Sequence, residues 1–329
     1  MTGVLFVAFL ARAIKFATVF IFGSTGETIT EKSGHLNMGI PGIMYLGALG
    51  GIIGEKIYVS SVGFDPANYS GFMILFMPIL FAMLFAALGG LLFAFFTVTL
   101  KCNHNVTGLT ITTFGVGLSC YFIGTLSSEG ISDAGMMLQS LFVPNGFDWN
   151  GNWFGEIFLS QSFFTYLAII VAIVAAIIIS KTRVGLNLRA CGENPAAADA
   201  AGINVDKYRY LATILGAAIA GLGGMALEID LYKGMFNVAD AVDSFGWLAL
   251  SLVIFSMWKP TICIFASFLF GMLTVLPYYI PSLDSVQMQV FALIPYVATI
   301  LVLILTSIFN KKNAQPPAGL GITYFREDR

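Results

Sequence analysis

Long apolar segments separated by short polar ones constrain this chain more than any other feature. A transmembrane helix needs roughly 20 consecutive, mostly apolar residues. Nine segments approach or exceed that length: 4–22, 36–54, 72–100, 106–126, 163–180, 210–231, 245–258, 261–280 and 288–309. Only 10% of the 329 residues are charged, whereas soluble domains carry about a quarter. We therefore expect an all-α polytopic membrane protein, in which residues 1–329 form one transmembrane domain of about nine helices, within a range of eight to ten.

The positions of the basic residues predict the orientation of the chain, because Lys and Arg accumulate in the cytoplasmic loops of membrane proteins. No Lys or Arg lies between Cys102 and Ser180, so we expect the acidic connection 127–161 to be an external loop. Five of the sixteen basic residues fall in the polar stretch 181–209, and four more follow residue 310. The loop 181–209 and the tail 310–329 are therefore expected in the cytoplasm.

The first apolar segment carries two basic residues, Arg12 and Lys15, on one helix face. Either this face looks into the bundle, which gives nine spans with an external N-terminus, or the segment lies along the inner surface and eight spans remain. Long basic side chains also snorkel to the interface without a specific role. No small-residue cleavage site follows this segment, so we expect no removable signal peptide.

Two segments are interrupted by Gly or Pro, the second near Pro41 and the seventh, 245–258, before Pro260. Short or interrupted helices in corresponding halves of a transporter point to its binding region. We expect these two segments to correspond in an inverted repeat. Asn37, beside the first interruption, would bond to freed backbone groups or to cargo, while the glycines of both halves are expected to let helices pack closely.

Polar and aromatic side chains in the spans suggest a pathway. Thr112 and Thr113 either bond to carbonyls four residues earlier or line a polar passage. Trp247 and Trp258 are expected as interfacial belt residues, or Trp247 would stack on an aromatic ligand. Phe245 would add an aromatic group to the pathway. The candidate pathway residues are therefore Asn37, Thr112, Thr113, Phe245 and Trp247.

The distribution of charge bears on the energy source, because ion-driven carriers place ionisable residues deep in their spans. Apart from Arg12 and Lys15, the charges are expected at span ends and in loops. Glu228 and Asp230 are expected close enough to the interface for water to solvate them. A partner would then supply the energy.

Motifs for chemistry within the chain itself are missing. The sequence has no GxxxxGK[ST], GxSxG or HExxH, which hold ATP phosphates, a serine nucleophile and zinc respectively. His35 and His104 stand alone in loops, and the four cysteines lie far apart. We expect no catalytic residue, no metal site, no cofactor bound by this chain and no enzymatic activity.

The sequence resembles the inner-membrane permeases of ABC importers for branched-chain amino acids, ribose-type sugars and nucleosides. The likeness rests on GLNLRACGENPAAADAAGINVDKYRY, GAAIAGLGG, SGHLNMGIPGIMYLGALGG, FGWLALSLVIFSMWKP and PPAGLGITYFREDR. The second-span and C-terminal segments look most like the shorter nucleoside-type subunit. The resemblance implies a type II importer-like fold in the bacterial inner membrane, a second paralogous permease, a lipoprotein receptor and an ATP-binding subunit with two cassettes that holds ATP and Mg²⁺.

The resemblance also implies that part of the 181–209 loop couples the permease to its ATPase. Asn194 and Pro195 open a turn, Ala196–Ala201 predicts a short helix, and Gly202 suits its end. Arg189, Glu193, Asn194, Ala198, Asp199 and Gly202 are the candidate coupling residues, with flanking charges setting orientation. The alternative is a solvated loop whose basic residues only follow the positive-inside rule.

These observations predict the permease subunit of an ATP-driven importer for nucleosides, moved by the 194–202 helix. One alternative is a permease of the same family for sugars or branched-chain amino acids. The other is an ion-coupled or facilitative carrier that acts alone.

Overall fold

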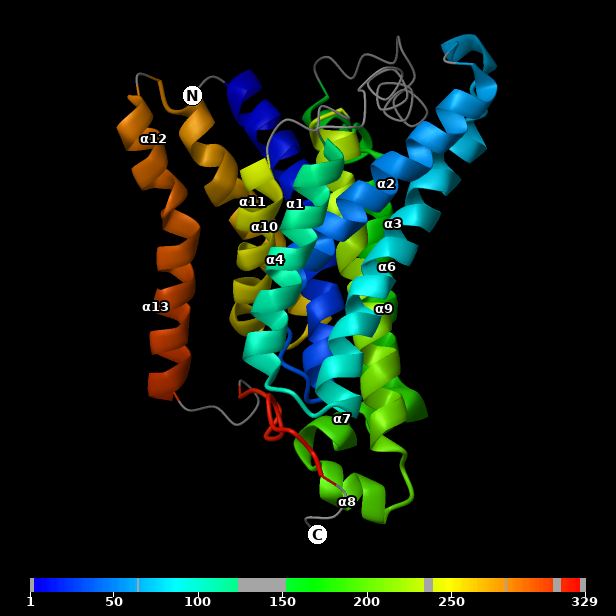
Figure 1. Ribbon diagram of the computed structural model, residues 1–329. Coiled ribbons are helices and arrows are strands. Elements are labelled where there is room, and N and C mark those ends of the chain that lie inside the picture. The colour runs from blue at the N-terminus through cyan, green and yellow to red at the C-terminus, as the bar shows by residue number, and fades with distance from the viewer. Residues whose placement is uncertain are drawn as a thin grey trace.

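The computed structural model describes residues 3–63, 65–123, 152–233, 239–281, 283–309 and 315–325, and all regular structure in these ranges is helical (Figure 1). The longer helices are α1 (Gly3–Lys32), α2 (Ile40–Val62), α3 (Gly71–Ala94), α4 (His104–Ile123), α6 (Phe163–Lys181), α9 (Val205–Met225), α10 (Ala239–Phe255), α11 (Pro260–Val275) and α13 (Ile294–Phe309). The shorter ones are η1 (Pro66–Asn68), η2 (Phe95–Thr99), η3 (Gly155–Leu159), α7 (Arg183–Glu193), α8 (Pro195–Ala200), η4 (Ala226–Leu231), η5 (Leu276–Tyr279) and α12 (Ser285–Ala292).

Six stretches of the described chain are long and apolar enough to cross a membrane: Gly3–Lys32, Gly71–Thr99, Phe163–Lys181, Val205–Leu231, Pro260–Tyr279 and Ser285–Val302. The expected polytopic, all-helical protein is confirmed for these residues. Helices α2, α4 and α10 run alongside the six (Figure 1), and a count of nine spans remains an expectation. The expected external loop 127–161 lies mostly outside the described residues.

Helix α1 passes through the centre of the bundle, in contact with α6, α9, α10 and α11. Its side chains are buried on all sides from Phe16 to Thr28, as expected for a helix enclosed by other helices. The alternative in which this segment lies along the inner surface is therefore wrong. Arg12 is exposed, and its guanidinium carbon lies 5.6 Å from the centre of the Tyr278 ring.

Glycines bring the central helices close together, as the sequence predicts. A Cβ added to Gly47 on α2 would lie 2.3 Å from the backbone of Gly221 on α9, and one added to Gly115 on α4 would lie 2.3 Å from the carbonyl oxygen of Gly42. Within a lipid bilayer the hydrophobic effect does not drive helices together, so close backbone packing of this kind is a main source of helix association.

Three predicted boundaries differ from the structure. Helix α1 continues to Lys32, ten residues beyond the predicted end at Phe22. Its last turns are covered by other helices and do not face lipid, so they can contain polar residues. Helix α2 begins at Ile40, so Pro41 lies in its first turn, where proline is tolerated, and does not interrupt it. Helix α10 begins at Ala239 and is 17 residues long, longer than the predicted segment 245–258.

The two ends of the bundle differ in structure. Helices α7 and α8 and the C-terminal segment 315–325 lie together at one end, whereas η5 and α12 lie at the other (Figure 1).

Candidate functional site

The predicted short helix in the polar stretch is confirmed as α8. Asn194 is its N-cap, and its side-chain oxygen accepts a hydrogen bond of 3.0 Å from the Ala197 N–H. Pro195 occupies the first turn, and Gly202 follows the helix with a φ of +83°. Only glycine adopts this left-handed conformation without strain, so local sequence alone defines both ends of α8.

A second helix, α7, precedes it and was not predicted. Thr182 is its N-cap and accepts a hydrogen bond from the Gly185 N–H at 3.1 Å. Its buried residues Gly185, Leu188 and Cys191 recur every three positions, which is the spacing of one helix face. This weak periodicity was the signal that could have found α7.

The predicted coupling residues differ in how they are placed. Ala198 is buried, packing with Cys191 and Val205, and so holds α8 against the protein. Asn194, Glu193 and Gly202 are exposed, while Arg189 and Asp199 are half-buried. The outward face of α8 is formed by its other alanines: Ala196, Ala197 and Ala200.

The C-terminal segment lies across α7 and α8 (Figure 1), a contact that the sequence did not predict. The Gly319 N–H donates to the Gly192 carbonyl at 2.8 Å, and the Ala318 N–H donates to Glu193 Oε2 at 3.2 Å. Further along, Tyr324 Oη donates to Asp199 Oδ2 at 2.9 Å. The predicted coupling residues Glu193 and Asp199 are therefore both held by the tail.

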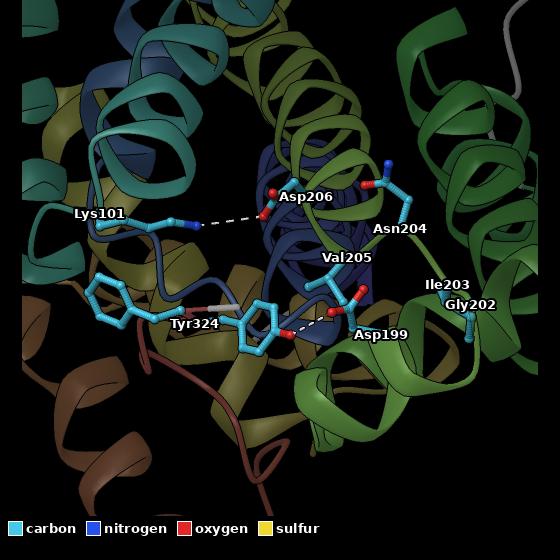
Figure 2. Close-up of a pocket in the computed structure, with 9 residues that line it drawn as sticks. Lys101, Asp199, Gly202, Ile203, Asn204, Val205, Asp206 and Tyr324 are labelled. Carbon is cyan, nitrogen blue, oxygen red and sulfur yellow. Dashed lines mark hydrogen bonds and ion pairs between the residues drawn. The ribbon is translucent and has the colours of Figure 1, made fainter. Parts of the chain in front are cut away.

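A pocket of about 530 Å³ lies between the tail and the start of α9 (Figure 2). Its walls include Tyr324 and Phe325 on one side and the α8–α9 turn on the other. Lys101, from the connection between η2 and α4, faces Asp206 with 3.6 Å between Nζ and Oδ1. The pocket is thus lined by four parts of the chain: α8, the α8–α9 turn with the start of α9, the connection before α4, and the tail.

The tail, which lines this pocket, is connected to the bundle interior through Arg209. The side chain is 2% exposed, and its Nη2 donates to the Ile322 carbonyl of the tail at 3.4 Å. The Gly321 N–H bonds to the carbonyl of Gly34, in the connection between α1 and α2, at 3.0 Å. Movement of the tail would therefore reach both α9 and the connection that follows α1.

The two histidines do not stand alone, so that prediction is wrong. The rings of His35 and His104 meet edge to face, with centroids 4.8 Å apart, and His35 Nδ1 lies 3.2 Å from Thr213 Oγ1. Burial, together with the charge of nearby Arg209, lowers the pKa of His35 well below its usual range, so His35 is neutral at pH 7. No cluster of three or more metal ligands occurs in the described part of the chain.

Two acids at the end of the first span are buried among other helices. Glu27 and Glu31, one turn apart on α1, are 0% and 2% exposed. The Asn37 N–H donates to Glu27 Oε1 at 3.1 Å, and the Trp258 indole donates to Glu31 Oε2. Trp258 is consequently a buried partner and not an interfacial belt residue. The sequence did not predict this burial, because α1 was expected to end at Phe22, before both acids.

Two more acids expected to be solvated are buried at the other end of the bundle. Glu228 and Asp230, both in η4, are 2% and 5% exposed, and Ser162 Oγ donates to Asp230. Glu55 on α2 is fully buried, and neither carboxylate oxygen is bonded to a donor among the residues that the structure describes. The helices around these ends extend further than the apolar segments indicated, so water is excluded from the carboxylates.

The predicted pathway residues do not form one cluster. Asn37 and Thr112 both bond to the connection before α2, to the Gly39 N–H and the Met38 carbonyl respectively. Thr113 bonds to the Leu109 carbonyl of its own helix. Phe245 is 7% exposed, its ring 5.6 Å from Phe16 and 5.1 Å from Phe20, and Trp247 is half-buried two residues later.

Comparison with known proteins gives one family. Residues 9–306 match the family described as the branched-chain amino acid transport system permease component. The chain is 32% identical to the nucleoside ABC transporter permease protein NupC of Lactococcus lactis, with 96% of each chain covered. It is 32% identical to the putative glucose ABC transporter permease protein TsgC13 of Haloferax volcanii, over 81% of this chain and 76% of that one. It is 26% identical to the guanosine ABC transporter permease protein NupQ of Bacillus subtilis, with 95% of each chain covered. No solved structure matches.

Proposed function

The chain belongs to the family of branched-chain amino acid transport system permease components, and we propose that it is the permease subunit of an ATP-driven importer for nucleosides. The resemblance to NupC over 96% of both chains is the observation that carries the proposal. The equally identical TsgC13 covers less of this chain and is named for glucose, so a sugar is the alternative cargo.

The energy of ATP hydrolysis in a partner subunit would reach this chain through α8. Its outward face consists of alanines, which lose little side-chain entropy when they enter a groove on another protein. Arg189, Glu193 and Asp199 flank this face, and the tail bonds to Glu193 and Asp199. We infer that ATP and Mg²⁺ are held by a separate ATP-binding subunit, which pushes α8 and so moves the bundle between its outward and inward openings.

The remaining assignments follow from the same proposal. The loop 181–209 and the tail 310–329 lie in the cytoplasm, the loop 127–161 lies outside, and the protein resides in the bacterial inner membrane with a second permease and a receptor lipoprotein. The bundle contains about nine spans in a type II importer-like arrangement with an inverted repeat. Asn37, Thr112, Thr113, Phe245 and Trp247 are proposed to line or support the pathway, since a neutral nucleoside needs aromatic and hydrogen-bonding groups in place of a charge clamp.

A stand-alone ion-coupled carrier is the second candidate, and one observation favours it. Glu27, Glu31, Glu55 and Glu228 are all buried, and buried acids in membrane helices commonly serve ion transport. The family of the chain argues for the ATP-driven reading, in which these acids have structural roles.

Reconstitution separates the two candidates. Proteoliposomes are prepared with the chain alone and with a two-cassette ATPase, a second permease and a receptor from the same operon, and uptake of radiolabelled adenosine is followed with and without ATP. We expect uptake only in the complete assembly with ATP. Uptake by the chain alone under a proton or sodium gradient would contradict the proposal.

Competition identifies the cargo. Excess unlabelled guanosine or uridine is expected to block adenosine uptake, whereas glucose and leucine are expected to leave it unchanged. Inhibition by glucose together with indifference to nucleosides would transfer the assignment to sugars.

A further inference from the structure

A second pocket lies at the end of the bundle opposite α7 and α8, with a volume of about 380 Å³. Four aromatic rings contribute to its walls: Tyr232, Phe245, Tyr278 and Tyr296. Ser244 and Thr274 add hydroxyl groups, and none of its lining residues is charged. Small-molecule sites are typically cavities of about 300–1,000 Å³ lined by apolar and aromatic side chains with a few polar groups, so size and lining both suit a ligand.

The order of the helices places this pocket on the side from which cargo would arrive. Tyr232 directly follows η4, which continues α9 away from α8, and Ser244 lies near the beginning of α10. Tyr278 lies in η5, after α11 has returned from Pro260. Figure 1 shows this end, marked by α12, opposite α7 and α8. In the orientation proposed above, the pocket faces the outside.

We propose that this pocket is the nucleoside-binding site of the permease in the conformation described here; the assignment rests on the proposed function. A nucleoside has a flat, uncharged base and a hydroxylated sugar. Aromatic rings offer faces on which a base stacks with little regard for its identity. An uncharged lining avoids leaving a buried charge without a partner when a neutral cargo enters.

The rings are held in ways that suit different roles. Phe245 is fixed in the core by its stacked contacts with Phe16 and Phe20 and forms a rigid wall. Tyr278 is 61% exposed, with the Arg12 guanidinium against its ring, and so provides an accessible stacking face. Arg12 would thus hold the Tyr278 ring in position.

A long hydrogen bond joins two residues that line the pocket. Tyr296 Oη on α13 donates to the Ser244 carbonyl on α10 at 3.4 Å. Hydrogen bonds near this length are weak, so this bond contributes little to holding α13 against α10.

Photolabelling of the complete importer tests the assignment. The assembly in nanodiscs is irradiated with 8-azidoadenosine, with and without excess adenosine, and the labelled peptides are identified by mass spectrometry. We expect adenosine-protected label on peptides containing Tyr232, Tyr278 or Tyr296. Tyr278→Ala should reduce the protected label roughly tenfold, the scale of a lost base–aromatic stack. Tyr121→Ala, at a tyrosine on α4 that is also largely exposed, should not change it.

The wild-type experiment does not depend on the folding of any variant. Protected label confined to other segments would overturn the pocket assignment, as would labelling of these peptides by a photoreactive phospholipid that adenosine fails to displace. If the assembly takes up adenosine while the pocket remains unlabelled, only this inference fails. If it takes up no nucleoside, the proposed function fails as well.

Discussion

Tyr324 donates a hydrogen bond to Asp199 at 2.9 Å, although 125 residues separate them in the chain. The bond joins the C-terminal segment to α8, the helix proposed to receive the movement of the ATPase. Because the same segment also bonds to Arg209 and to the Gly34 carbonyl, it connects α8 with two central helices of the bundle. We expect it to transmit force as well as to hold α8 in place.

Tyr324→Phe is expected to weaken the attachment of the tail. The variant loses one hydrogen bond, with a net contribution of about 1 kcal/mol, so the undocked population should rise roughly fivefold. Cys191 packs beneath α8 with Tyr324 nearby, so its rate of reaction with a maleimide reports undocking. Tyr166→Phe, which removes a tyrosine hydrogen bond to the Phe158 carbonyl, should leave that rate unchanged; equal rates in both variants would show that the bond does not hold the tail.

The thiol of Cys191 should contribute a pH-dependent term to stability. Burial raises its pKa, so above the ordinary thiol pKa of about 8.5 the unfolded chain loses a proton that the folded chain retains. The contribution is thus complete below that pH and is lost as the pH rises. We expect the melting temperature to fall less between pH 7 and pH 10 in Cys191→Ala than in the wild type. Cys102→Ala, at an exposed thiol, serves as the control and should match the wild type.

Substitutions on opposite faces of α8 should act differently. Ala197 is exposed and Ala198 is buried, so Ala197→Arg obstructs only an external partner, whereas Ala198→Arg also forces α8 away from Cys191 and Val205. We expect Ala197→Arg to retain wild-type thermal stability while ATP hydrolysis no longer drives uptake. Full transport by this variant would exclude the outward face of α8 as the contact.

Two glycines on α4 offer a matched test of helix packing. A Cβ at Gly115 would lie 2.3 Å from the Gly42 carbonyl oxygen, whereas one at Gly117 would meet nothing within 4 Å. Gly115→Ala should destabilise the protein by about 1–3 kcal/mol through overpacking. Gly117→Ala should be neutral or slightly stabilising because alanine favours the helix. Melting temperatures in detergent measure both, and equal values would contradict the close approach of α2 and α4.

Trp258→Phe is expected to expose the energetic cost of burying Glu31. The phenyl ring fills much of the indole volume but cannot donate to Glu31 Oε2, and loss of the donor to this buried oxygen should cost about 1–3 kcal/mol. The loss should appear as a lower melting temperature. Trp153→Phe, at a side chain that is 62% exposed, should have little effect, and an equal loss in both variants would indicate that packing alone is responsible.

Local features were predictable. Apolar length predicted that the long helices would be membrane helices, and the cap, proline and glycine of α8 predicted a six-residue helix whose ends are set by backbone chemistry. The span 72–100 agrees closely with α3 and η2 together, which cover Gly71–Thr99. In each case the determining interactions join residues a few positions apart.

The errors share one cause. Glu27 and Glu31 were expected outside the spans because a hydropathy pattern ends at the first polar residues, yet neighbouring helices supply the donors that permit their burial. Likewise, nothing near His35 in the sequence indicates His104, which meets it through the packing of helices.

The sequence by itself determined that this protein is a helical membrane protein with a short capped helix at α8, because apolar length and helix caps act within one or two turns. Only the tertiary structure decided that the tail is bonded to α8 through Tyr324 and Asp199, and that five acids of the described chain lie buried. Those contacts join residues far apart in the chain, and the packing of the helices determines which residues meet.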